Sequence, residues 1–399
     1  MMESRRWSIV IVVTLCLILL ANLDYVINVH NDAPNDSVTL VQKKRRSPSY
    51  SSPDKEEDRR GFNCTSANKD PSDWKSHITF GIIGVQKGGT TFLHSVLSQH
   101  PLVRPSRQKE IHCFDYNWNP KDPECKSGFK IQQLQSNPRS VSFDASPSYI
   151  WNTETVIPRF LHAFPCLKFL VLLRNPIDRY YSQHNMMVKY VRHRQPPSFH
   201  DRVLTGMEHL LAAGLLPHWQ FNDVLSSSQS NPNRTLADYA AATIDLDIFE
   251  RFHGSKEEIK AWKVLLKRGS VPPRCAGGVS ALLKAPCVDV IETINSVSIS
   301  RGLYSIMLSR WLQFFPSERI LTLKFDDFQN TVGLNKTLAK IYQFINLPHR
   351  DYKLDNEHAK PPYSREKVGE VAYDVLQKLY APYTEKLQSV LGDDWKNPW

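Results

Sequence analysis

The side chains best suited to chemistry lie in a glycine turn between an apolar stretch and a helical one. Residues 80–101 read FGIIGVQKGGTTFLHSVLSQHP, and the turn at their centre consists of Lys87, Gly88, Gly89, Thr90 and Thr91. A turn that ends a strand and opens a helix presents free backbone N–H groups, which bind anions. The glycines let the backbone approach a phosphate closely, the threonines add hydroxyl donors, and the lysine adds a positive charge. The turn is therefore a candidate phosphate site; the alternative is a glycine turn without a ligand.

The order of residues in this turn argues against two common nucleotide-binding loops. A nucleotide kinase would carry GxxxxGK[ST], with its lysine after the last glycine, whereas Lys87 precedes the glycine pair. The GxGxxG sequence of dinucleotide-binding folds is absent as well. If the turn binds a phosphate, it therefore does so in a different way from these two loops.

Apolar and helical stretches alternate around the turn. Strands are predicted at residues 78–85, 140–145, 167–173 and 319–325. Helices are predicted at residues 90–99, 153–164, 176–190 and about 365–391. Asn175 before Pro176 provides a capping side chain and a proline at the first helical position. This alternation predicts an α/β fold whose central, mostly parallel sheet is flanked by helices, with ligands bound at the carboxyl ends of the strands.

The N-terminal sequence predicts a membrane anchor. Arg5 and Arg6 precede an apolar run from Trp7 to Leu23. The length of this run is marginal but adequate for a helix that crosses a bilayer, and the positive charges before it favour an N-terminus in the cytosol. The predicted order is a cytosolic tail (1–6), a transmembrane signal anchor (7–27), a polar luminal stem (28–76) and a catalytic domain (77–399). The alternative is a cleaved signal peptide. Both interpretations send the chain into the secretory pathway, which argues against nucleic acid as the partner of a chain with a net charge of +10.

Sequons and cysteines agree with a secretory location. Candidate glycosylation sites are Asn35, Asn63, Asn233 and Asn335. Outside the apolar N-terminal run there are six cysteines, which permit up to three disulfides, with buried free thiols as the alternative. Cys275 with Cys287 is the favoured pair because it closes a short loop containing glycine and proline. No CxxC pair is present, so no metal site is predicted.

Several motifs together resemble the sulfotransferase family, specifically the membrane-anchored Golgi enzymes that sulfate glycans. Residues 85–91 resemble the family's 5′-phosphosulfate loop, residues 173–182 its 3′-phosphate motif, and residues 109–115 the KE-x-H-x-FD segment of heparan sulfate sulfotransferases. The same pattern continues at residues 302–311, 315–316, 325–328 and 380–383. The resemblance covers the chain from about residue 77 to its C-terminus and implies a P-loop-like sulfotransferase fold.

The resemblance also implies a donor and a set of site residues. The donor is 3′-phosphoadenosine 5′-phosphosulfate (PAPS), the product is PAP, and no metal is required. The glycine turn would hold the 5′ end of the donor, while Arg174 and Ser182 would hold its 3′-phosphate, because arginine suits multi-oxygen anions. A surface salt bridge is the alternative for Arg174.

The segment at residues 109–115 would supply the catalytic groups. Glu110 is the implied general base, and Lys87 would stabilise negative charge on the leaving phosphate and the sulfuryl oxygens. His112 would orient the base or the sugar, and Lys109 and Asp115 are candidate substrate contacts. A solvated Lys109–Glu110 charge pair and a structural histidine are the alternatives.

The expected acceptor is an acidic glycan of the heparan or chondroitin/dermatan type, modified in the Golgi lumen at a hydroxyl or an amine by a single-pass type II membrane enzyme. Two other functions remain open from the sequence. One is a luminal nucleotide-dependent kinase, and the other is a non-catalytic, heparin-binding membrane protein with the same fold.

Overall fold

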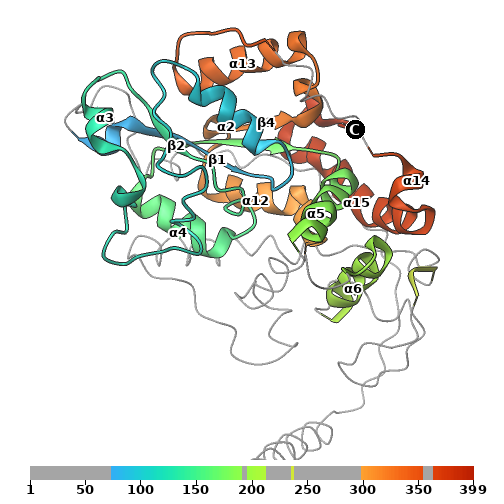
Figure 1. The fold of residues 1–399 in the computed structure, drawn as a ribbon. Coiled ribbons are helices and arrows are strands. Elements are labelled where there is room, and N and C mark those ends of the chain that lie inside the picture. Colours follow the sequence, from blue (N-terminus) through green and yellow to red (C-terminus); the bar gives the residue numbers. More distant parts are fainter. Residues whose placement is uncertain (1–72, 191–195, 213–234, 238–297, 354–362) are drawn as a thin grey trace, which may run out of the picture. The chain divides into compact units, whose positions relative to one another are not determined.

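A computed structural model describes residues 73–190, 196–212, 235–237, 298–353 and 363–399 (Figure 1). All of them belong to one compact unit, Asp58–Trp399. The predicted tail, anchor and most of the stem lie outside the described residues, as do Asn35, Asn63, Asn233, Cys275 and Cys287. Within the described ranges, no helix is both long and apolar enough to cross a membrane.

A parallel sheet of four strands forms the centre of the described fold. The strands are β1 (Ile78–Gly84), β2 (Ser142–Asp144), β3 (Lys168–Leu173) and β4 (Ile320–Lys324), in the spatial order β2-β1-β3-β4. All three neighbouring pairs are parallel. Each strand falls within a predicted one, so the predicted α/β fold with a parallel sheet is confirmed.

Helices cover both faces of this sheet (Figure 1). On one face, α2 (Thr90–Ser98) and α13 (Thr331–Ile345) share a buried apolar cluster with β1 and β3 side chains such as Phe80 and Leu170. On the other face, α4 (Thr153–Ala163) and α12 (Tyr304–Phe314) pack on strand residues such as Phe169. Strands buried on both faces read as continuous apolar runs, which explains why the sequence marked them clearly.

A second helical cluster adjoins the carboxyl end of β3. It contains α5 (Pro176–Tyr190), α6 (Phe199–Ala212) and the first part of α15 (Glu370–Leu391). The predicted C-terminal helix at 365–391 is divided, because Gly369 adopts a φ of 91° between α14 (Arg365–Val368) and α15. The remaining elements are α3 (Ile131–Gln135) and the short 3-10 turns Trp74–His77, Lys126–Gly128, Ser300–Gly302, Ser317–Arg319, Phe325–Phe328 and Asp393–Trp395.

The strand order determines where a ligand can bind. From β1 the chain crosses to β2 on one side, and β3 then lies on the other side of β1. Such a reversal opens a crevice at the carboxyl ends of the strands, the usual ligand position in open parallel sheets. The glycine turn follows β1 and Arg174 follows β3, so both predicted anion-binding motifs lie at this crevice.

Candidate active site

The glycine turn between β1 and α2 depends on its two glycines. A Cβ on Gly88 would lie 2.6 Å from the carbonyl oxygen of Leu172, and a Cβ on Gly89 would lie 2.8 Å from the ring of Phe325. Gly89 also has a φ of 96° and directly precedes the first residue of α2, and Lys87 has a φ of 68°. Because no side chain fits at either glycine, the backbone is held close to its neighbours at the start of a helix. This arrangement suits a phosphate.

Arg174 lies against the same turn from the end of β3. Its side chain is only 9% exposed, and its Nη1 lies 3.4 Å from the carbonyl oxygen of Lys87. Its Nη2 is 3.9 Å from the Asp178 carboxylate, and its guanidinium carbon lies 4.8 Å from the ring centre of Phe325 and 5.5 Å from that of Tyr363. The buried Nε has no hydrogen-bond partner within the described structure. A buried guanidinium with such long and incomplete contacts has donors left for an oxyanion.

The helix and loop that follow Arg174 hold it in place. Asn175 Oδ1 accepts hydrogen bonds from the backbone N–H of Ile177 at 2.9 Å and of Asp178 at 3.3 Å, which confirms the predicted cap before Pro176. The hydroxyl of Tyr304, at the start of α12, donates to the carbonyl oxygen of Arg174 at 2.8 Å. The backbone of Arg174 is therefore fixed from two sides.

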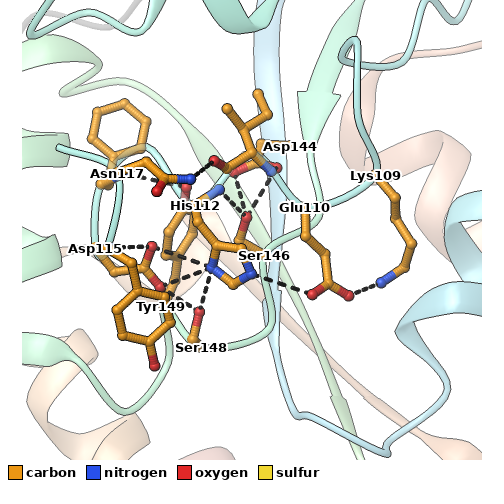
Figure 2. A network of polar contacts seen from close by, with 12 residues as sticks. Lys109, Glu110, His112, Asp115, Asn117, Asp144, Ser146, Ser148 and Tyr149 are labelled. Atoms are coloured by element: carbon orange, nitrogen blue, oxygen red, sulfur yellow. Dashed lines mark hydrogen bonds and ion pairs between the residues drawn. The ribbon is translucent and has the colours of Figure 1, made fainter. Parts of the chain in front are cut away.

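A chain of charged contacts lies nearby, in the loop after α2 (Figure 2). Glu110 pairs with Lys109 through one carboxylate oxygen, and its other oxygen lies 3.3 Å from His112 Nε2. His112 Nδ1 lies 3.2 Å from the Asp115 carboxylate, whose side chain is 2% exposed, and Ser148 Oγ donates to that same carboxylate. The imidazole is thus held between two carboxylates, and Glu110 is the more exposed of them.

The end of β2 supports this cluster from beneath. Asp144 Oδ1 accepts a hydrogen bond from the backbone N–H of Ile111 at 3.1 Å. Ser146 Oγ donates to the Asp144 carboxylate at 2.9 Å and accepts from the backbone N–H of His112 at 2.9 Å. These bonds fix the backbone that directly follows Glu110 to the edge of the sheet.

The two carboxylates keep the cluster ionised at neutral pH. The hydrogen bonds that His112 donates to Asp115 and then to Glu110 raise its pKa to about 9. The hydrogen bond from His112 is the largest influence on Glu110 and, with Lys109, lowers its pKa to about 2 despite partial burial. His112 is therefore an imidazolium, and Glu110 is a carboxylate that can accept a proton but has none to donate. In the described part of the chain, no group of three or more His, Cys, Asp or Glu side chains is arranged to hold a metal ion.

The structure brings most of the predicted site residues together. The glycine turn and Arg174 touch through the Lys87 carbonyl, and the residues 109–115 segment forms one connected cluster. Thr90 is buried in the first turn of α2, whereas Thr91 is exposed, and Ser182 lies half-buried on α5. Asn335 is within α13, where its Oδ1 accepts from the backbone N–H of Tyr352 at 2.8 Å.

Three cysteines for which the sequence suggested no specific pairing are disulfide-bonded. Cys113 pairs with Cys125 across a separation of 12 residues, with Cα atoms 6.0 Å apart, and Cys166 is disulfide-bonded as well. The Cys113–Cys125 bond closes the loop of residues 113–125, which begins within the Glu110 cluster. It thereby links the functional segment to a loop that has little regular structure of its own.

Three site residues were missed. Ser148 follows β2, and its position at the carboxyl end of a parallel strand was a signal that could have identified it. Phe325, in the FDDF sequence after β4, packs against both the glycine turn and Arg174, although nothing in its type marks it as a site residue. Arg301 donates to Gln86 Oε1 at 2.7 Å and lies 4.2 Å from the ring centre of Trp151, and only the tertiary fold shows this.

Comparison with known proteins places these features in a family. A sequence model described as "Sulfotransferase domain" matches residues 78–398. The membrane-associated sulfotransferase kil1 of Dictyostelium discoideum is 24% identical over 335 residues, covering 79% of this chain and 66% of that protein.

Two further relatives carry carbohydrate names. Carbohydrate sulfotransferase 15 of Rattus norvegicus is 23% identical over 374 residues, covering 79% of this chain and 54% of that protein. Heparan sulfate glucosamine 3-O-sulfotransferase 5 of Mus musculus is 34% identical over 111 residues, or 27% of this chain and 30% of that protein. The chain spans 66% of the length of the kil1 protein and 54% of that of carbohydrate sulfotransferase 15.

Proposed function

Because the chain belongs to the sulfotransferase domain family, we propose that it transfers a sulfuryl group from PAPS to a hydroxyl or an amine of a glycosaminoglycan-type glycan. The single observation that carries this proposal is the convergence of the glycine turn, the buried Arg174 and the Glu110 cluster at one end of the sheet. The carbohydrate names of two relatives support a glycan as the acceptor.

The residues present fit a donor with phosphate at both ends. The backbone of the turn would bind the 5′ end, because a Cβ at Gly88 or Gly89 would collide with its neighbours and the start of α2 offers free N–H groups. Arg174, with its orphaned Nε, would bind the 3′-phosphate, and Ser182 would add a hydroxyl. The bound donor would supply the activated sulfuryl group.

Glu110 would take the proton of the acceptor. Its low pKa makes it a weak base, so proton transfer would accompany attack by the acceptor, when the acceptor oxygen becomes acidic, rather than precede it. Lys109 and His112 would hold the carboxylate in one orientation, and the positive charge of Lys87 would stabilise the negative charge that develops on the opposite side.

We also propose the cellular setting that the sequence predicts. Residues 7–27 would anchor the chain in the Golgi membrane with residues 77–399 in the lumen, and residues 28–76 would form the stem. The basic net charge of +10 favours an acidic acceptor in that compartment.

The test is incubation of the purified full chain with PAPS carrying radioactive sulfate and a panel of sulfated and desulfated glycosaminoglycans, followed by disaccharide analysis. We expect label in at least one glycan and none in protein or in small phenols. Absence of label from every glycan, or transfer of phosphate from ATP instead, would show that the assignment is wrong. Glycan binding without any transfer would support the non-catalytic alternative.

A further inference from the structure

A charged cavity lies at the end of α2 that is remote from the glycine turn. It has a volume of about 310 Å³ and is lined by Gln99, the residue that ends α2, and by the segment that follows α13. The nine residues of α2 span about 14 Å, so this cavity is separate from the candidate active site. A volume of this size is at the lower end of the range for small-molecule sites, and it is enough for one sugar unit.

The cavity lining carries two cations and one carboxylate, so positive charge is in excess. Arg350 and Lys353 both line it and are exposed, and within the described ranges neither of them forms an ion pair. Arg350 donates only to the backbone carbonyl of Gln99. The single acidic side chain in the lining, Asp351, contacts the ring of His349 at 2.8 Å and not either of the two cations. Two cations with free donors therefore face a space that accepts an anion.

The rest of the lining suits a sugar that carries this anion. The hydroxyl of Tyr352 and the amide of Gln99, which lie 3.5 Å apart, offer neutral hydrogen-bonding groups. Val96 and Tyr342 are buried beneath the lining and expose little apolar surface to it. A polar cavity that combines cations with hydroxyl and amide groups suits a sulfated or carboxylated sugar.

A basic segment connects this cavity with Glu110. Arg104 donates to the carbonyl of Pro101 at 2.8 Å, two residues beyond the carbonyl that Arg350 bonds. From there the chain runs parallel to β2, with Val103 bridged to Val141 and the backbone N–H of Arg104 bonded to the Val141 carbonyl at 2.8 Å.

This edge segment continues to the catalytic cluster. In extended form, the seven residues from 103 to 109 span about 20 Å. They carry Arg104, Arg107 and Lys109 without any acidic side chain, and Glu110 follows directly. A row of cations therefore leads from the cavity to the proposed base.

We propose that this cavity, with Arg350 and Lys353 at its mouth, is an exosite that binds a distal acidic sugar of a long glycan whose reactive sugar lies at Glu110. The inference rests on the proposed function for its choice of ligand. It adds a second contact point that a short acceptor cannot reach, so the exosite selects for chain length rather than for the sugar that is sulfated.

The test uses the full chain and the double variant Arg350→Ala/Lys353→Ala. The matched control, Lys336→Ala/Lys340→Ala, removes two exposed cations from neighbouring α13 and changes the net charge equally. Equilibrium binding is measured with a fluorescently labelled heparin-type polysaccharide, with the corresponding tetrasaccharide, and with inorganic sulfate as a competitor. Sulfate transfer is measured in parallel with the same two glycans as acceptors, and thermal unfolding confirms that each variant folds.

We expect the exosite variant to bind the polysaccharide about tenfold more weakly and to raise its KM by a similar factor, equivalent to about 1.4 kcal/mol. Its tetrasaccharide affinity and its kcat should match those of the control. Equal polysaccharide binding by the two double variants would overturn the exosite, as would equal losses for the polysaccharide and the tetrasaccharide.

The two proposals fail in different ways. Selective loss of polysaccharide binding without any sulfate transfer by the unmodified chain would support the exosite and refute the enzymatic function. Sulfate transfer with an unchanged polysaccharide KM in the exosite variant would support the enzyme and refute the exosite. Binding of inorganic sulfate alone, without binding of either glycan, would also refute the exosite.

Discussion

Asp115→Asn is the most direct test of the charged cluster, because Asp115 makes the largest contribution to the raised pKa of His112. The rise from 6.5 to about 9 corresponds to about 3 kcal/mol of added stability for the protonated imidazole. Since the folded-state pKa is the higher one, this stability is fully present below pH 6.5 and is lost as the pH rises through about 9. Removing the charge of Asp115 should abolish at least half of it, or about 1.5 kcal/mol.

The assay is urea-induced unfolding of the unmodified chain and the variant at about pH 6 and about pH 9.5, on either side of the His112 titration. Asp115 also accepts from Ser148 and from the backbone N–H of Tyr116, and loss of those bonds costs stability at both pH values. The informative quantity is therefore the change in the deficit between the two pH values. We expect the deficit to be about 1.5 kcal/mol larger at the lower pH.

Asp122→Asn is the matched control. Asp122 accepts hydrogen bonds from Lys126 and Ser127 in the neighbouring loop, and it contacts no histidine in the described structure. Its deficit should be the same at both pH values. If Asp115→Asn behaves in the same way as this control, His112 is not the protonated centre that the geometry implies, and the reasoning about Glu110 fails with it.

Three further substitutions test the proposed chemistry. Lys87→Ala should lower kcat by about 10²- to 10³-fold in the sulfate-transfer assay with little change in unfolding free energy, and an undiminished kcat would remove Lys87 from the mechanism. Glu110→Gln should lower kcat by about 10²- to 10⁴-fold while calorimetry shows unchanged affinity for PAP; a weakened PAP affinity would point to a role in donor binding instead. Arg174→Lys should weaken PAP binding about tenfold because a lysine loses the planar, multi-donor geometry, and equal affinity would mean that Arg174 does not contact the 3′-phosphate.

Local patterns were sufficient for the strands and for the starts of α2, α4 and α5. Strands β1 and β3 and most of β4 are apolar because helices cover both faces of the sheet, and such runs are visible without knowledge of the partner strands. The start of α5 was equally local, because Asn175 caps backbone groups two and three residues ahead. The break at Gly369 was missed, because apolar periodicity continues through it and a glycine is compatible with either outcome.

The contacts that set the protonation states of the Glu110 cluster could not be predicted from local sequence patterns. The sequence placed Lys109, Glu110, His112 and Asp115 within seven residues but left open a solvated charge pair. Ser148, which completes the cluster, comes from a segment 33 residues away from Asp115. Its approach depends on the pairing of β1 with β2, which sequence distance does not reveal.

By itself, the sequence determined the α/β class, the parallel strands, the glycine turn and the family, because each of these depends on short-range patterns or on motifs in a fixed order. Only the tertiary structure decided that Arg174 lies against the Lys87 carbonyl, that Phe325 packs against both Arg174 and the glycine turn, and that His112 bridges two carboxylates. Strand order is set by packing between segments that are remote along the chain. The partners that surround each functional group, and therefore its charge and its free donors, follow from that order.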